Sequence, residues 1–303
     1  MMYLYIGLGI VAFLVIGFLA SMPIGSYMCY KKFFFRGIER KELSDAHYDK
    51  FRQDICAARE RMEKLPFAEQ HITAADGVDL YGRYYDYGRD KTVIFLHGAS
   101  SHPLNNFSVT AERFIEWGFN VLIPDMRAHG KSGGEHVTYG KRESDDLLEW
   151  IKFITQNHPA KIVLYGISLG AAIIGMTSDR LPSDVRAAVY DCGFTSVGNM
   201  INRIAKQTHA PKPMFAMLAK RCKRELGIDF NASTLDHIKN TAVPSFFIHG
   251  TEDAAVPCEH SRQNYEACSA PKQLLLVEGC GHTTAALNGD SAAKIHNFIN
   301  NYL

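Results

Sequence analysis

Short apolar runs alternate with helical patterns from about residue 69 to the end of the chain, and this alternation strongly constrains the fold. Several runs rich in β-branched and aromatic residues have the length of buried strands: 92–96, 120–124, 161–165, 187–190, 245–248 and 273–277. Helical patterns fall between them at 107–117, 139–157, 169–179, 258–267 and 291–303. This order predicts an α/β fold with a mainly parallel sheet, because right-handed crossover helices then cover both faces.

An antiparallel hairpin is expected before these strands. The segments 71–73 and 80–85 flank Ala75-Asp76-Gly77, and an Asp-Gly pair between two strand patterns is a hairpin signal. With the later runs, the hairpin gives an expected sheet of eight strands. Ligands of open α/β sheets bind beyond the carboxyl ends of the parallel strands, so reactive side chains are expected where strands end.

Two segments match Gly-x-Ser-x-Gly, the pattern of a nucleophile elbow, and they are centred on Ser168 and Ser132. An elbow needs a buried strand before the first glycine and a helix after the second, because the strained turn must lift the serine hydroxyl above a sheet. Ser168 has both, since the run 161–165 precedes it and the small apolar residues 171–176 follow. Ser132 lies between polar segments without a helical pattern. Ser168 is therefore the expected nucleophile, and Ser132 is expected in a loop.

A carboxylate and a histidine at two further strand ends supply the chemistry that a serine nucleophile needs. A serine hydroxyl is weakly nucleophilic, so an imidazole must accept its proton and a carboxylate must fix the ring tautomer. Asp253 and His282 each follow one of the last two apolar runs, and they lie 85 (253 − 168) and 114 (282 − 168) residues after Ser168. Asp191, at the end of an earlier run, is the alternative acid. Other histidines near strand ends are expected to be structural: His97, His102, His129 and His249.

With these motifs the chain resembles serine hydrolases of the α/β-hydrolase superfamily over about residues 69–303. The resemblance implies the α/β-hydrolase fold, with a mainly parallel eight-stranded sheet, helices on both faces and a short helical lid. It also implies an oxyanion hole formed by the backbone amides of Ala99 and Leu169. Within the superfamily, the chain is most similar to membrane-anchored α/β-hydrolase-domain proteins and their bacterial esterase-like relatives.

The net charge argues against a nucleic-acid-binding protein, and the cysteine spacing argues against a cysteine-ligated metal site. The net charge of +1 gives no field strong enough to attract nucleic acid. The seven cysteines are scattered and show no metal-ligand spacing, so they are expected to be reduced packing residues. No metal and no other cofactor is expected.

The first 30 residues carry no charged side chain, and residues 3–22 supply the roughly 20 apolar residues that span a bilayer. No basic residue precedes the apolar run, which favours an uncleaved anchor over a cleavable signal peptide. The basic residues that follow are expected on the cytoplasmic side, together with the catalytic domain: Lys31, Lys32, Arg36, Arg40 and Lys41. The expected location is a membrane, crossed once, with the lipid bilayer as a partner.

Three parts are expected: a transmembrane anchor at 1–30, a basic juxtamembrane segment with an amphipathic helix at 31–66, and a catalytic domain at 67–303. The helix is predicted at about 45–65, with Ser44 as its N-cap, packed on the body as a strut. Within the catalytic domain, an insertion at about 193–237 contains many apolar residues. Its prolines predict two short helices that form either a lid over the serine or a packed insertion.

These features predict a membrane-anchored serine hydrolase that cleaves a carboxylic ester or thioester through an acyl-enzyme. Ser168 is the expected nucleophile, His282 the general base and then acid, and Asp253 the carboxylate that orients the imidazole. A serine peptidase of the same fold is one alternative, although nothing in the sequence resembles a gate that restricts peptide entry. A catalytically silent scaffold is another, although all three triad positions and the elbow glycines are intact.

Overall fold

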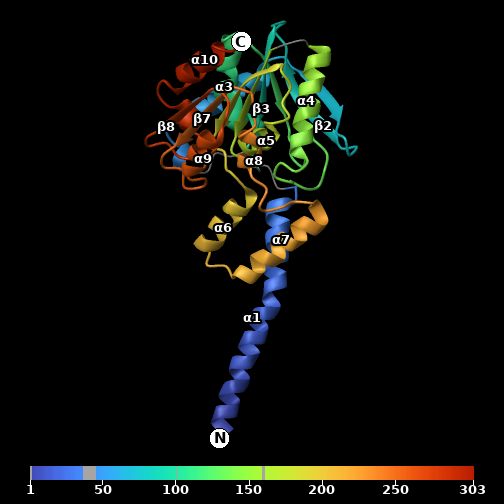
Figure 1. Ribbon diagram of the computed structural model, residues 1–303, viewed down its shortest axis with the longest axis vertical. Helices are drawn as coiled ribbons and strands as arrows, with labels where there is room; N and C mark the ends of the chain where they lie inside the picture. The colour runs from blue at the N-terminus through green and yellow to red at the C-terminus, as the bar shows by residue number, and fades with distance from the viewer. Residues whose placement is uncertain (1, 37–45, 100, 159–160) are drawn as a thin grey trace.

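The computed structural model describes residues 2–36, 46–99, 101–158 and 161–303, with side chains described from residue 17 onwards except at residues 19 and 47. Its central feature is an eight-stranded sheet with the order β1-β2-β4-β3-β5-β6-β7-β8 (Figure 1). The strands are β1 (Ala68–Thr73), β2 (Asp79–Tyr85), β3 (Lys91–Leu96), β4 (Asn120–Pro124), β5 (Lys161–Ile167), β6 (Val185–Asp191), β7 (Ser245–Gly250) and β8 (Lys272–Val277).

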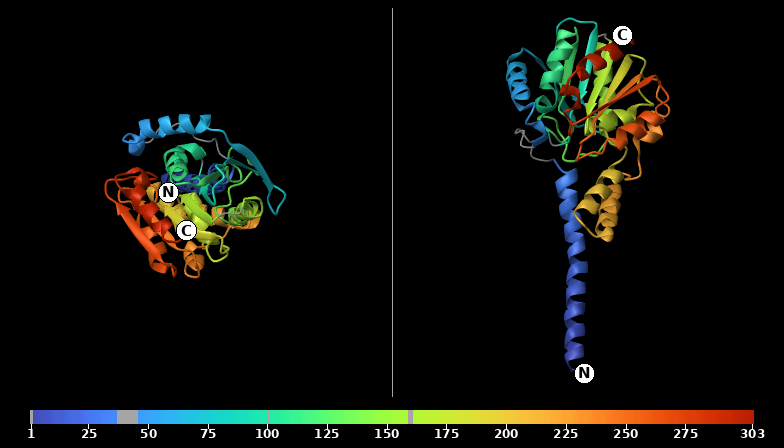
Figure 2. Two further views of the ribbon diagram at one scale, coloured as in Figure 1. Left: turned by 90° about the horizontal axis from the view of Figure 1, so that it is seen from above. Right: turned by 90° about the vertical axis from the view of Figure 1, so that its left-hand side faces the viewer.

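The helices surround the sheet or project from it (Figures 1 and 2). They are α1 (Met2–Phe34), α2 (Arg52–Lys64), α3 (Pro103–Glu116), α4 (Glu143–Asn157), α5 (Leu169–Thr177), α6 (Val197–Gln207), α7 (Lys212–Leu226), α8 (Thr234–Ile238), α9 (Glu259–Ala267) and α10 (Ser291–Asn300).

The sheet is mixed and not purely parallel. Strands β1 and β2 form the predicted hairpin, and β2 also pairs antiparallel with β4. The other neighbouring strands pair in parallel. The expected α/β fold with eight strands is confirmed. The antiparallel β2–β4 contact was not predicted, because the sequence pattern shows where strands lie but not which strands become neighbours.

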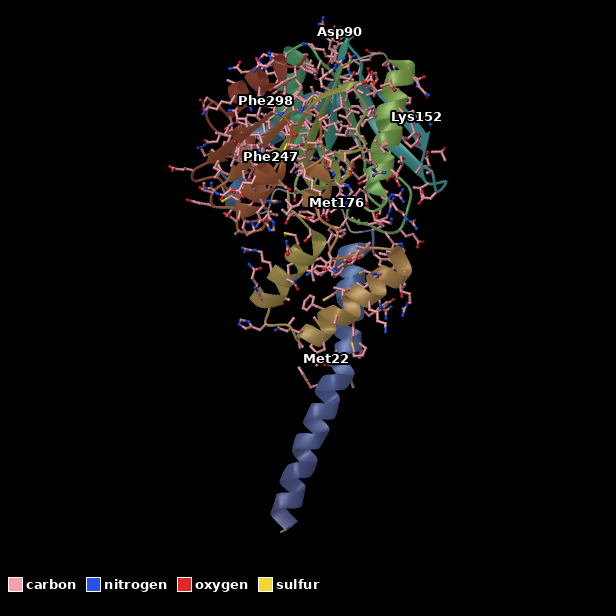
Figure 3. All side chains as sticks on the ribbon, viewed as in Figure 1. Met22, Asp90, Lys152, Met176, Phe247 and Phe298 are labelled. Carbon is pink, nitrogen blue, oxygen red and sulfur yellow. The ribbon has the colours of Figure 1, made fainter. Side chains whose placement is uncertain are left out.

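Alternate residues of the central strands point to opposite faces of the sheet, and each face has its own hydrophobic core. In β3, Ile94 and Leu96 belong to the core under α4 and α5, whereas Val93 and Phe95 belong to the core under α3 and α10. Figure 3 labels one residue of each core, Phe247 and Phe298. Burial on both faces explains why these strands are near-continuous apolar runs in the sequence.

The N-terminal helix α1 extends away from the body, but its last turns are part of it (Figures 1 and 2). These turns pack against α7, and Tyr30 and Phe34 are buried in the core that contains α4 and α5. The helix thus runs through the expected boundary at residue 30 and ends within the body. Figure 3 shows the buried Met22 where α1 meets α7.

A helix able to span a bilayer is not found among the described residues, so the transmembrane helix expected within 1–30 is not supported by the structure. The side chains of α1 that the structure describes begin at residue 17, and they include the polar or charged Ser21, Ser26, Lys31 and Lys32. Arg40 and Lys41, two of the expected flanking basic residues, lie outside the described residues.

The predicted strut helix is shorter than expected. A short 3-10 turn covers 46–48, and α2 follows with Ile55, Ala58 and Met62 buried at the predicted spacings. It packs on α3, and Arg61 donates two hydrogen bonds of 2.7 Å to Glu112 on that helix. Ser44, the predicted N-cap, lies outside the described residues.

The predicted insertion contains the helices α6, α7 and α8. Pro211 is the N-cap residue of α7 and Pro213 lies in its first turn, where the missing backbone N–H would have no helical partner. The prolines therefore begin the second helix. Both α6 and α7 lie on the same side of the body as α1 (Figure 1).

Candidate active site

Ser168 occupies a strained turn between β5 and α5. Its backbone has φ 53° and ψ −109°, an unusual conformation of the kind that costs a non-glycine residue about 1–3 kcal/mol and clusters at functional sites. The motif glycines let the turn close. A Cβ on Gly166 would lie 2.5 Å from the Ala171 nitrogen, and one on Gly170 would lie 1.8 Å from the Leu96 oxygen.

The structure brings Ser168, His282 and Asp253 together at the carboxyl edge of the sheet. The Ser168 Oγ lies 3.1 Å from His282 Nε2, and His282 Nδ1 lies 2.6 Å from Asp253 Oδ2. The three residues follow the strands β5, β8 and β7. The Asp253 side chain is fully buried, whereas 19% of the His282 side chain is exposed. The serine hydroxyl thus has a proton acceptor within hydrogen-bond distance, backed by a carboxylate.

Hydrogen bonds keep the Asp253 carboxyl ionised. Burial alone would raise its pKa, but hydrogen bonds from His249, from His282 and from the Val256 amide outweigh burial and hold the pKa well below its usual range. Because an ionised carboxylate only accepts hydrogen bonds, Nδ1 of His282 must carry a proton. In the neutral ring, Nε2 is then free to accept the serine proton.

His249 is a second histidine on the same carboxylate. The sequence predicted a structural role for His249 but not this contact. Its Nε2 lies 3.1 Å from Asp253 Oδ2 and 2.9 Å from the Val256 carbonyl. Both partners are acceptors, so Nε2 donates and Nδ1 accepts from the Ser261 hydroxyl at 2.7 Å. The available signal was its position at the end of β7, four residues before Asp253. This buried imidazole braces the acid of the triad.

Ala99 and Leu169, whose backbone amides are the expected oxyanion donors, line the same cavity as Ser168. Neither amide donates a hydrogen bond to another residue that the structure describes. An oxyanion hole needs two such donors for the negatively charged oxygen on a substrate carbon bonded to the serine, and its assignment to these two amides stays a prediction.

His97 fixes the loop that carries Ala99. Burial lowers the pKa of His97 to about 3, so the ring is neutral. Its Nε2 accepts from the Met126 amide at 3.0 Å, which leaves Nδ1 to donate to the Gly98 carbonyl at 2.8 Å. In a trans peptide the N–H points opposite to the C=O, so this contact also sets the direction of the Ala99 N–H. The interpretation of His97 as a structural neighbour of this loop agrees with these contacts.

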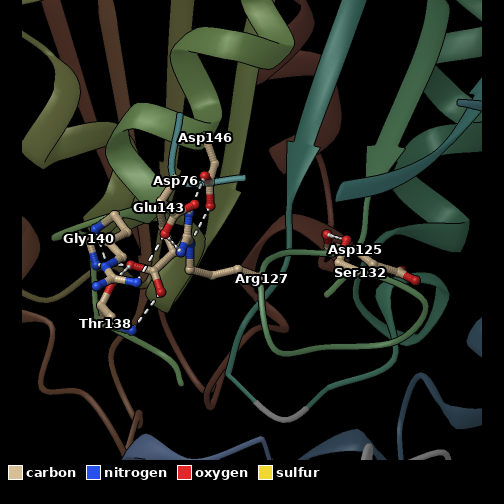
Figure 4. Close-up of polar contacts among 9 residues, drawn as sticks. Asp76, Asp125, Arg127, Ser132, Thr138, Gly140, Glu143 and Asp146 are labelled. Atoms are coloured by element: carbon tan, nitrogen blue, oxygen red, sulfur yellow. Dashed lines mark hydrogen bonds and ion pairs between the residues drawn. The ribbon is translucent and has the colours of Figure 1, made fainter. Parts of the chain in front are cut away.

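Ser132, the other serine in a Gly-x-Ser-x-Gly pattern, is a buried loop residue. Its hydroxyl donates to the Asp125 carbonyl (Figure 4), and it accepts from the Tyr81 amide at 2.9 Å. In the same region, the Arg127 guanidinium binds the carboxylates of Asp76 and Asp146. Ser132 thus lies in a loop, as the sequence predicted, and it helps to hold that loop in place together with its charged neighbours.

Asp191, the alternative acid, is not joined to His282 by any hydrogen bond among the described residues. Its carboxyl accepts from the Tyr165 hydroxyl at 3.2 Å. Burial of the side chain raises the pKa of Asp191 to about 7. Asp253 is therefore the carboxylate that orients His282.

Cys192, Asp253 and His282 form the one group among the described residues whose ligand atoms, all within 4.8 Å of one another, could hold a metal ion. Burial and the nearby carboxylates raise the pKa of the Cys192 thiol well above its usual value. A metal would need the thiolate and would break the 2.6 Å contact between Asp253 and His282. We interpret the group as the acid–base pair with a buried thiol beside it.

Residues 88–234 match the family model Hydrolase_4, described as serine aminopeptidase, S33. This match supports a hydrolase of the α/β-hydrolase superfamily, and the eight-stranded sheet agrees with that fold.

Individual relatives cover most of the chain. The Bacillus subtilis protein YqkD is 29% identical over 286 residues, which cover 92% of this chain and 90% of that protein. The human alpha/beta hydrolase domain-containing protein 17B is 25% identical over 216 residues, covering 70% and 67%. A Pyrococcus furiosus esterase, Pf2001, superposes with a TM-score of 0.66 at 24% identity, covering 88% of this chain and 98% of the esterase. At that identity the solved structure shows the fold alone.

Proposed function

We propose that this protein is a serine hydrolase that cleaves carboxylic ester or thioester bonds through an acyl-enzyme. One observation carries the proposal: the hydrogen-bond chain from Ser168 Oγ to His282 Nε2 at 3.1 Å and from His282 Nδ1 to Asp253 Oδ2 at 2.6 Å. The strained backbone of Ser168 supports it, because strain of this kind persists only where the surrounding structure enforces it.

In the proposed reaction, Ser168 Oγ attacks the substrate carbonyl carbon while His282 Nε2 accepts the serine proton. The resulting oxyanion accepts hydrogen bonds from the amides of Ala99 and Leu169, and one such donor lowers the barrier by roughly 3–4 kcal/mol. The tetrahedral species expels an alcohol or thiol, which takes the proton from His282. Water then attacks the acyl-enzyme while His282 accepts a proton from it, and a carboxylic acid is released as Ser168 Oγ takes that proton back from His282.

A fluorophosphonate probe tests this proposal, because it labels only an activated serine. The wild type and Ser132→Ala should be labelled, and Ser168→Ala should not. Hydrolysis of a short p-nitrophenyl ester should fall at least about 10⁴-fold in Ser168→Ala. A folded wild type that neither reacts with the probe nor hydrolyses the ester would show a catalytically silent scaffold instead.

A peptidase of the same fold is the alternative that the family model's description brings forward. An aminopeptidase must bind the charged amino group of its substrate, which needs an acidic partner. No acidic side chain is present among the described residues that line the cavity beside Ser168. We therefore favour esters. Faster turnover of an amino-acid p-nitroanilide than of the matched acyl ester would reverse this preference.

We further propose that the protein is held at a membrane with its body on the cytoplasmic side. The support is the uncharged stretch 1–30 and the basic residues directly after it. In right-side-out sealed vesicles, the body of the full-length protein should resist external protease and should remain in the pellet after carbonate extraction. Release by carbonate, or digestion from outside, would overturn this proposal.

A further inference from the structure

An apolar cavity of about 180 Å³ lies directly beside Ser168. Helix α6 supplies one wall with Val197, Met200, Ile201 and Ile204, whose spacings of three and four place them on one face of the helix. Ala99 and Leu169, whose backbone amides are the proposed oxyanion donors, line the same cavity. A group bonded to Ser168 Oγ, with its oxygen at these amides, therefore extends into apolar surroundings.

Another part of the wall comes from the end of α1, which the sequence predicts to lie outside the catalytic domain. Phe33, in the last turn of α1, lines the cavity together with Tyr139. Two hydrogen bonds to backbone carbonyls fix this turn. The Tyr139 hydroxyl donates to the Phe33 carbonyl at 2.9 Å, and the Val137 amide donates to the Phe34 carbonyl at 2.8 Å. The fully buried Phe34 ring packs edge-on against Tyr139, with centroids 5.2 Å apart. Phe33 is thus held in place by the body.

The cavity suits a small apolar group. No charged side chain occurs among the described residues that line it. Its volume is below the about 300–1,000 Å³ that is typical of sites for drug-sized ligands. An apolar chain gains about 0.8 kcal/mol for each buried methylene, but only while the site has room for it.

We propose that Phe33 is a specificity-determining residue that limits the substrates of this enzyme to esters or thioesters of short apolar acyl groups. This inference rests on the proposed serine hydrolase function. It makes the end of the N-terminal helix part of the substrate-binding site.

The test is the dependence of kcat/KM on acyl length over p-nitrophenyl esters from acetate to laurate. The wild type should prefer a short acyl chain. Phe33→Ala should move the optimum to longer chains. It should also raise kcat/KM on the first ester longer than the wild-type optimum by about tenfold or more, because one methylene in an apolar pocket changes discrimination between substrates by roughly 10–200-fold. Phe33→Trp should move the optimum towards acetate.

Phe35→Ala is the matched control. Phe35 is partly buried like Phe33, but its ring packs on His136 with centroids 4.3 Å apart, and it does not line the cavity. Its length profile should equal that of the wild type. If Phe33→Ala does not fold, Ile204→Trp on the facing helix provides the second variant and should also shorten the preferred chain.

The outcomes separate the two proposals. Absence of ester turnover and of probe labelling in the wild type would remove the proposed function itself. Turnover with the same length profile in the wild type, Phe33→Ala, Phe33→Trp and Ile204→Trp would leave that function standing and overturn this inference. A wild type that prefers long acyl chains would overturn it as well.

Discussion

The loop around Ser132 and the turn around Ser168 share one five-residue pattern but place their hydroxyls in opposite situations. The Ser132 hydroxyl is fully buried and hydrogen-bonded to the backbone of Asp125 and Tyr81. The Ser168 hydroxyl faces a cavity, and its hydrogen-bond partner is the imidazole of His282. The reactivity of the serine therefore depends on the hydrogen-bond partner of its hydroxyl and on its access to a cavity, and the motif alone determines neither.

The second glycines of the two patterns show why the turns differ. Gly170 lies so close to β3 that a Cβ would stand 1.8 Å from the Leu96 oxygen. At Gly134 a Cβ would meet nothing closer than the Ala128 nitrogen at 3.6 Å, although φ is +87°. In the elbow, glycine permits close packing of a helix on the sheet, whereas in the loop it only permits a left-handed backbone.

The largest expected difference in kcat is between variants of two aspartates: Asp253, which is linked to Ser168 through His282, and Asp125, which is hydrogen-bonded to Ser132. Asp253→Asn should lower kcat about 10⁴-fold, because an amide can no longer fix the tautomer of His282 or stabilise its protonated form. Asp125→Asn should lower it less than about threefold, since the side-chain oxygen that accepts from the Lys131 amide at 2.8 Å remains. Ester hydrolysis at neutral pH measures both. Similar losses in the two variants would contradict the assignment of Asp253.

The glycines give the next largest effect. Gly170→Ala should destabilise the fold by more than about 4 kcal/mol, because the clash is with backbone that cannot move without parting α5 from β3. Gly134→Ala should cost only about 1–2 kcal/mol, the strain of a positive φ at a residue with a side chain. Urea unfolding of both variants measures the difference. Equal midpoints would show that α5 can shift away from the sheet.

The two serines should differ in the opposite sense when stability is measured: Ser132 should matter more than Ser168 for the free energy of unfolding. Ser132→Ala leaves the buried Tyr81 amide without its partner and should cost about 1–3 kcal/mol of unfolding free energy. Ser168→Ala should change it by less than about 0.5 kcal/mol, because the hydroxyl caps no helix and its partner His282 is partly exposed. Urea midpoints in the opposite order would contradict the structural role of Ser132.

Local pattern was sufficient to place the strands and the residues that follow them. The predicted strand at 120–124 coincides with β4, and Ser168, Asp253 and His282 follow predicted strands. This works because buried parallel strands are continuous apolar runs and their ends converge at one edge.

Contacts between distant segments were not predictable from the same patterns. An apolar stretch such as 1–30 has the same sequence pattern whether it enters a bilayer or packs on protein, so the burial of Tyr30, and of Phe34 just after it, was not predicted. The contact of His249 with Asp253 was not predicted for a related reason, since its neighbours Val256 and Ser261 reach it only after the loop beyond β7 has folded. Pairwise contacts of this kind depend on tertiary geometry.

The smallest predicted effect concerns the hydrogen bond by which His249 braces Asp253. The hydrogen bond from His249 helps to hold the pKa of Asp253 below its usual range. His249→Leu removes that donor, so the carboxylate becomes more basic and binds His282 Nδ1–H more strongly. The protonated form of His282 is then favoured, and this form cannot accept the serine proton. The acid limb of the pH profile, where kcat/KM falls as the pH is lowered, should therefore move to higher pH by up to about one pH unit.

His249→Gln is the conservative control, because its amide can still donate to the carboxylate and should keep the wild-type limb. In all three proteins Asp253 stays ionised across the limb, since in the wild type its pKa lies well below the usual range and the lost hydrogen bond is only one of its causes. One titrating group then governs the limb, so log kcat/KM should rise with a slope of about 1 against pH. A purely structural role for His249 would lower kcat/KM in His249→Leu without moving the limb, and that result would contradict the brace.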